Sequence, residues 1–112
     1  MQANANRADV VFISKISAMT EILSQDSVEP SVILQKLRKY IAENNKSYSN
    51  ALAQLNDTLL GLQGEDREAF KKEASPRLDA SLEAFGKAQM RLRARMNESE
   101  KVELSEVLMT LR

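Results

Sequence analysis

Apolar side chains recur every three or four residues along most of this chain, which is the spacing of one face of an α-helix. The longest such series runs from Leu34 to Leu62 and stays in phase across the polar stretch 44–47. A break at the asparagines of that stretch is the alternative, but a break would not be expected to preserve the phase. We therefore predict one helix of about 32 residues, roughly 48 Å long.

Turn and capping residues divide the rest of the pattern. Turn-favouring residues before Pro30 separate the first helix from the second, and Gly61 and Gly64 end the second helix. Asn97, with Glu100 three positions later, has the pattern of a capping box. The predicted helices span residues 6–25, 31–62, 65–96 and 99–111.

Two of these helices depend on the interpretation of single residues. Asn6 is expected to cap the first helix by accepting hydrogen bonds from its free amides. Ser75 and Pro76 interrupt the third helix, and a serine before a proline is also a good helix start. Because the apolar pattern keeps its phase through Pro76, we favour one kinked helix over two separate ones.

The lengths of the helices predict their arrangement. Two helices of about 32 residues joined by a tight glycine turn favour an antiparallel hairpin. The shorter helices 6–25 and 99–111 both connect at the open end of this hairpin and are expected to pack there. The prediction is an all-α, bundle-like fold of four helices, with residues 1–112 forming a single domain.

The short helices are too short to cover the tip of such a hairpin. Apolar residues at the tip would then need a partner to bury them, because two helices alone bury little surface. The alternative is that the third helix folds back at Ser75-Pro76 and closes the tip. On the first interpretation, the expected partner-binding residues are Leu52, Leu55, Leu59, Leu62 and Phe70.

Composition limits the chemistry available to this chain. It contains no histidine and no cysteine, so the usual imidazole and thiolate sites are excluded, and no nucleophile or phosphate-binding motif is present. We expect no enzyme, no cofactor, no metal site and no small-molecule substrate. The acidic cluster near the start of the last helix is interpreted as capping and dipole complementation rather than metal binding: Glu98, Glu100, Glu103 and Glu106.

The N-terminal segment lacks the basic and apolar regions of a secretory signal. The longest apolar run near it, residues 10–13, is too short to span a bilayer. These features predict a cytoplasmic protein with no membrane span, and leave export by a signal-less route open.

Two features of the long helices suggest specific contacts. Asn45 lies on the apolar seam, where a buried amide can fix register or partner number, although a wet position near the surface is equally compatible with the sequence. Lys87, Arg91 and Arg95 recur every four residues and could track phosphates. The plainer interpretation of this basic stripe is that cations favour the last turns of a helix.

The sixteen basic and sixteen acidic side chains cancel, so the chain has no overall attraction to nucleic acid. The leading expectation is a non-enzymatic helical protein–protein interaction module that binds itself or another helical protein through apolar faces. The alternative is a small nucleic-acid-binding regulator that uses the basic stripe. For stability, we expect Leu37 and Leu82 to be buried and Arg93 to matter little.

Overall fold

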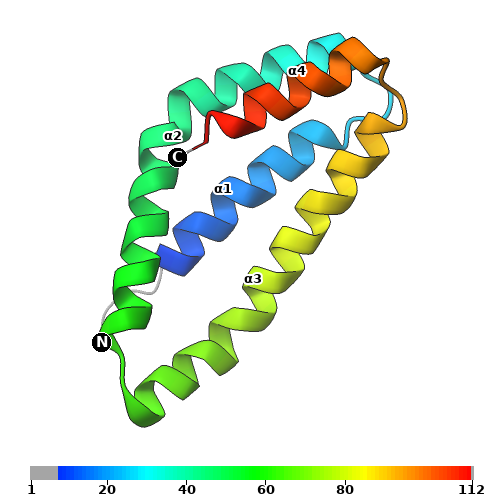
Figure 1. Ribbon diagram of the computed structural model, residues 1–112. Helices are drawn as coiled ribbons and strands as arrows, with labels where there is room; N and C mark the ends of the chain where they lie inside the picture. Colours follow the sequence, from blue (N-terminus) through cyan, green and yellow to red (C-terminus); the bar gives the residue numbers. More distant parts are fainter. Residues whose placement is uncertain (1–7, 112) are drawn as a thin grey trace.

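The computed structural model describes residues 8–111, and its four helices account for nearly all of them (Figure 1). The helices are α1 (Ala8–Leu23), α2 (Pro30–Gly61), α3 (Gly64–Arg93) and α4 (Glu98–Met109). No strand occurs within this range. The predicted all-α, four-helix fold is confirmed, and each described boundary lies within three residues of its prediction. The expected cap Asn6 lies outside the described residues.

Both long helices are continuous, as their unbroken phase predicted. α3 passes through Pro76 without interruption, and α2 passes through the asparagines. Nevertheless, α2 changes direction about midway, where its ribbon turns from teal to green (Figure 1). The Asn44 amide donates to the Tyr40 carbonyl at 2.9 Å, and the Ser47 hydroxyl donates to the Asn44 carbonyl at 3.1 Å. Such bonds from side chain to backbone commonly bend a helix without breaking it.

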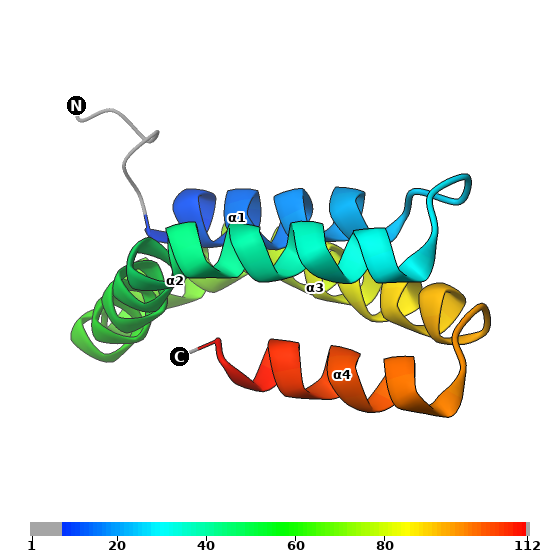
Figure 2. The same cartoon turned by 90° about the horizontal axis from the view of Figure 1, so that it is seen from above.

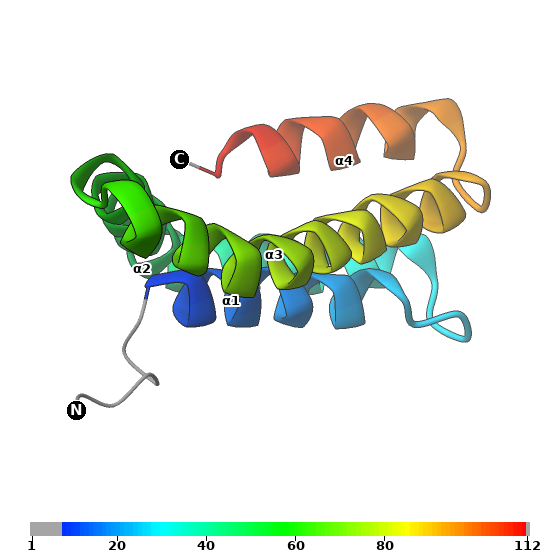
Figure 3. The same cartoon turned by 90° about the horizontal axis from the view of Figure 1, so that it is seen from below.

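α1 lies between the two long helices and packs against both, while α2 and α3 scarcely approach each other directly. The hairpin is therefore splayed, and α1 fills the space between its legs. α4 lies on the opposite side of the molecule from α1 and packs mainly against α2 (Figures 2 and 3). The fold is thus a layer of three helices, α1, α2 and α3, with α4 packed on one side.

The core consists of the inner faces of all four helices. α1 contributes a stripe at helical spacing, from Phe12 through Ile16 and Met19 to Leu23, in which every side chain is buried. Residues of α2, α3 and α4 that pack around it are fully buried as well: Ile33, Leu34, Leu37, Leu92 and Leu104. The Phe12 ring lies 5.4 Å from the ring of Tyr48, so α1 is also joined to α2 beyond the polar stretch 44–47. The predicted burial of Leu37 is confirmed.

The expected burial of Leu82 is wrong, because 47% of this residue is exposed. Two successive four-residue steps, from Ala74 to Leu78 and on to Leu82, rotate the side chain by about 80° around the helix axis. That rotation moves Leu82 off the face that α1 covers. The buried positions of α3 are instead Ala74, Ala88 and Leu92.

The expectation that Leu55 would be exposed at an uncovered tip is also wrong, because only 6% of this residue is exposed. Both short helices were expected to cover only the open half of the hairpin. α1 instead runs between the legs toward the tip, so its first turns reach the second half of α2 (Figure 1). The tip is partly covered in this way, without a fold-back of α3 at Pro76.

The turn between α2 and α3 depends on one left-handed residue. Gly64 has a φ of 58°, whereas Gly61 is the last residue of α2 and has a negative φ. Left-handed backbone is costly for any residue with a Cβ atom. Only Gly64 therefore has the left-handed role that we expected of both glycines.

We expect Gly64→Ala to lower the free energy of unfolding by about 1–2 kcal/mol, because alanine is strained at a positive φ. Gly86→Ala is the matched control. Gly86 lies inside α3 with ordinary helical backbone, and an added Cβ would meet no atom within 4 Å. This control should raise stability by about 0.5–1 kcal/mol. Urea denaturation of both variants checks the prediction, and equal effects at the two positions would contradict it.

Candidate interaction surface

The apolar residues predicted at the tip lie on or near the second half of α2. Leu55 belongs to the core, while the other four predicted residues are half-buried: Leu52, Leu59, Leu62 and Phe70. Three of them, Leu52, Leu59 and Phe70, pack against the apolar cluster. Leu60, which the sequence analysis did not single out, is 80% exposed, more than any other large apolar side chain described. The adjacent leucines 59 and 60 are the signal that could have found it, because adjacent residues lie 100° apart around a helix and both cannot point into the core.

Asn45 fixes the point where α4 ends. Its side-chain amide donates to the carbonyl of Thr110 at 3.1 Å, and Thr110 is the residue that caps the C-terminus of α4. Carbonyls at a helix C-terminus have no partner within their own helix, so this bond satisfies one of them. Asn45 is half-buried. Asn45 on the apolar seam therefore stabilises a contact within the chain, between α2 and the end of α4. A role of Asn45 in selecting a partner stays a prediction.

The second half of α2 has a face that α4 does not reach. α4 has 12 residues and spans about 18 Å, whereas α2 has 32 residues and spans about 48 Å. Beyond Asn45, the face of α2 that points toward α4 continues without a helix over it. Five residues on this side of α2 form what we call the distal strip: Leu52, Ala53, Asn56, Leu59 and Leu60.

The segment that carries the distal strip is almost free of charge. Among residues 47–63, Asp57 is the only charged side chain. The following stretch, residues 64–73, has seven charged side chains in ten positions. Burial raises the pKa of Tyr48, next to the strip, above its ordinary value of 10.0, so this phenol stays neutral as well. The distal strip is thus an apolar and neutral surface beside a strongly charged one.

The basic stripe makes contacts within the chain. The Lys87 ammonium lies 3.2 Å from the Glu83 carboxylate, one turn earlier in α3. The Arg91 guanidinium lies 2.9 Å from the Asp26 carboxylate, and Arg95 donates to backbone carbonyls of the same loop between α1 and α2. Arg91 and Arg95 therefore connect the end of α3 to this loop, and a phosphate ligand would have to compete with these partners.

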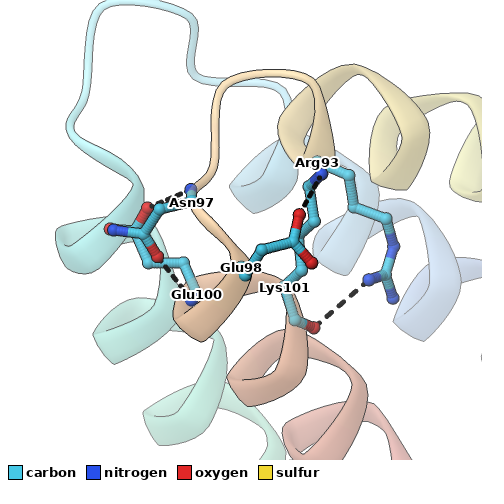
Figure 4. Close-up of polar contacts among 5 residues, drawn as sticks. All are labelled: Arg93, Asn97, Glu98, Glu100 and Lys101. Carbon is cyan, nitrogen blue, oxygen red and sulfur yellow. Dashed lines mark hydrogen bonds and ion pairs between the residues drawn. The ribbon is translucent and has the colours of Figure 1, made fainter.

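The junction of α3 and α4 confirms one local prediction (Figure 4). The Asn97 side chain accepts a hydrogen bond from the Glu100 amide at 2.8 Å, and the Glu100 carboxylate accepts one from the Asn97 amide at 3.1 Å, so the capping box is present. The Lys101 ammonium lies 3.2 Å from the Glu98 carboxylate. These contacts account for part of the acidic cluster as helix-end interactions.

Arg93, whose replacement we expected to change stability little, makes contacts that the sequence did not indicate. Its guanidinium donates to the Lys101 carbonyl at 3.2 Å and to the Ser105 hydroxyl at 3.0 Å. Since α4 packs mainly on α2, these bonds are its principal polar attachment to α3. On the other side of α4, the Arg38 guanidinium lies 2.7 Å from the Glu103 carboxylate.

We found no match for this chain among protein-family models, curated proteins or solved structures. Its site has to be interpreted from its own residues. Within residues 8–111, no three acidic side chains lie close enough together to hold a metal ion. No described helix combines the length and the apolar character that crossing a membrane requires.

Proposed function

We propose that this protein is a non-enzymatic helical protein–protein interaction module that binds a helical partner through the distal strip. The observation that supports this proposal most directly is the exposure of Leu60, at 80%, within an apolar face that lies beyond the end of α4. Isolated apolar residues are normal on a protein surface, but grouped ones mark contact sites. Here Leu60 adjoins the half-buried Leu52 and Leu59 on the same strip.

The geometry favours a helix as the ligand. The strip follows one side of a helix and presents side chains at three- and four-residue spacing, which is the pattern that helical ligands match. Burying one fully exposed leucine contributes about 1.5–3 kcal/mol. The half-buried leucines contribute less, so the strip supports binding of moderate strength rather than a permanent complex.

We expect Leu60→Gln to abolish partner binding while the monomer keeps its thermal stability, because the side chain makes little internal contact. Leu55 would be a poor choice for this test, since it belongs to the core and its replacement would unfold the chain. Met109→Gln is the matched control, because Met109 is 76% exposed but lies on α4. Sedimentation of the chain alone, and capture from cell extract, measure binding to itself and to other proteins.

The proposal holds if the unmodified chain and Met109→Gln bind the same protein, a second copy included, and Leu60→Gln does not. It fails if no binding of either kind occurs, or if Leu60→Gln binds as well as the unmodified chain. A cytoplasmic location, expected from the N-terminal sequence, stays a prediction that cell fractionation can test.

Nucleic-acid binding through Lys87, Arg91 and Arg95 stays a prediction too. The ion pairs of Lys87 and Arg91 and the hydrogen bonds of Arg95 to backbone carbonyls give it no added support. Salt separates the two functions, since phosphate binding weakens steeply with added salt and apolar association does not.

A further inference from the structure

α4 is the helix that the rest of the chain holds least firmly. It packs mainly against α2, whereas α1 packs closely against both long helices. It has 12 residues, and isolated helices of that length are marginal in water. Two of its side chains are buried, Leu104 and Val107. Because elements with few buried apolar contacts open before the rest of a structure unfolds, α4 is the helix that we expect to detach first.

α4 lies along the first half of α2, on a surface that we call the α4 seat and define by four residues: Leu34, Arg38, Ile41 and Asn45 (Figure 2). Arg38 pairs with a carboxylate of α4, and Asn45 donates to a carbonyl at the end of α4. Leu34 and Ile41 lie on the same side of α2, because steps of four, three and four residues follow one helix face. Both are buried, with 1% and 4% exposed. The seat thus combines apolar area with one cation.

The charges of the two surfaces are complementary. The first half of α2, residues 30–46, has four basic side chains and one acidic one, whereas α4 has four acidic side chains and one basic one. At the contact itself, the Arg38 guanidinium lies 2.7 Å from the Glu103 carboxylate. Since opposite charges guide and orient binding partners, the seat is suited to an acidic helix.

α4 fills its seat incompletely. A groove of about 150 Å³, open to solvent, remains between α2 and α4 and is lined by Arg38, Glu106, Val107 and Thr110. Unfilled space at a helix contact forfeits the attraction that close packing provides. A helix with larger apolar side chains at the positions of Glu106 and Thr110 would fill this groove and bind the seat better than α4 does.

The seat continues into the distal strip. From Asn45, steps of four, three and four residues lead through Ser49 and Leu52 to Asn56, on the same side of α2. α4 ends at Asn45, so a longer helix in its place would contact this second part as well. The added contact matters, because the short linker 94–97 gives α4 a high effective concentration at its seat. A partner helix displaces α4 only by making more contact than α4 makes.

We propose that the α4 seat is the binding site for an acidic amphipathic helix of another protein, and that α4 occupies it in the free chain as an autoinhibitory helix. The partner helix has apolar side chains at three- and four-residue spacing and a carboxylate opposite Arg38, as α4 has at Glu103. This inference rests on the proposed function, because the same helix continues onto the distal strip. It adds the charge of the partner and the way in which its binding is controlled.

Thiol labelling tests the release of α4, because the natural chain contains no cysteine. Val107→Cys places a thiol on the inner side of α4, at a position that is 4% exposed. We expect this thiol to react at least about tenfold faster than global unfolding of the same variant allows. Ile16→Cys is the matched control, since Ile16 is 1% exposed in α1 and should react only through global unfolding.

A peptide of residues 97–111 provides the acidic amphipathic helix as a separate molecule. Glu103→Arg and Arg38→Glu in the full chain each place like charges between α4 and its seat, so both weaken the attachment of α4. The Glu103→Arg chain keeps Arg38 and should bind the natural peptide about fivefold more tightly than the Arg38→Glu chain does. A peptide that carries Glu103→Arg should show the opposite preference. Fluorescence anisotropy measures the four affinities, and thermal melting checks the fold of both chains.

The unmodified chain should bind the natural peptide more weakly than the Glu103→Arg chain does, because its own α4 competes. Equal affinities for the two charged chains, no binding to either, or labelling of Val107→Cys only at the rate of global unfolding would each overturn the inference. So would a dimer of the Val107→Cys chain that labels more slowly than the monomer, since α4 of a second copy would then be the occupant.

Failure of this inference is distinguishable from failure of the proposed function. The peptide is about as short as α4 and does not reach the distal strip, so its binding does not depend on Leu60. If these tests fail while Leu60→Gln still abolishes partner capture, the interaction module stands and α4 is only a structural helix.

Discussion

Leu37→Ala is expected to lower the free energy of unfolding by about 2–5 kcal/mol, whereas Leu82→Ala should lower it by only about 1 kcal/mol. Leu37 is 0% exposed and lies in the cluster that surrounds α1. Truncation there removes buried methyl groups and leaves a cavity that the close-packed helices cannot fill. Leu82 is 47% exposed, so truncation removes mostly surface that is already in water and opens no enclosed space.

Urea denaturation of the two variants, analysed with a common slope, measures this difference directly. The two substitutions remove the same atoms from the same residue type, so each is the control for the other. Equal losses would mean that Leu82 is a core residue and that α1 does not separate α2 from α3 as described. A loss below about 1 kcal/mol at Leu37 would contradict the core assignment itself.

Arg77→Ala is expected to lower the free energy of unfolding by about 1–3 kcal/mol. Asp9 is 0% exposed, and the Arg77 guanidinium lies 3.0 Å from its carboxylate. Removing Arg77 takes away a cation that compensates this buried charge. The arginine side chain is 48% exposed, so the effect falls below that of a fully buried pair.

Arg67→Ala is the matched control, because Arg67 is an exposed arginine of the same helix, and it should change stability by less than about 0.5 kcal/mol. Asp9→Asn should cost less than Arg77→Ala, since the neutral amide needs no compensating charge. Thermal and urea melts of the three variants provide the comparison. If Arg77→Ala and Arg67→Ala behave alike, the pair does not hold α1 against α3.

Features that depend on neighbouring residues were predictable from sequence. The four helices, the uninterrupted passage through Pro76 and the capping box of Asn97 and Glu100 all follow from the spacing of side chains within a few turns. Interactions between residues close in sequence are enough to determine each of these features, so the local sequence pattern predicts them.

Features that depend on distant residues were not predictable in the same way. Nothing in the pattern around Asp9 indicates its partner, because Arg77 lies 68 positions away. The position of α1 between the long helices is a tertiary arrangement, and it decides that Leu55 is buried and Leu82 is not. The predicted partner-binding residues were the least accurate part, because exposure at the tip depends on where α1 lies. Leu60 was not predicted for the same reason.

The position of α1 between α2 and α3 also constrains the order in which the chain can fold. α2 and α3 are joined by a tight turn, yet they share little direct contact, so they cannot nucleate the structure as an isolated pair. α1 and α2 are adjacent in sequence and pack closely, and their association closes only a short loop. Since α3 packs on α1 rather than on α2, we expect α3 to dock after α1 has presented its apolar stripe, and the contact between Asp9 and Arg77, 68 positions apart, to form at that stage.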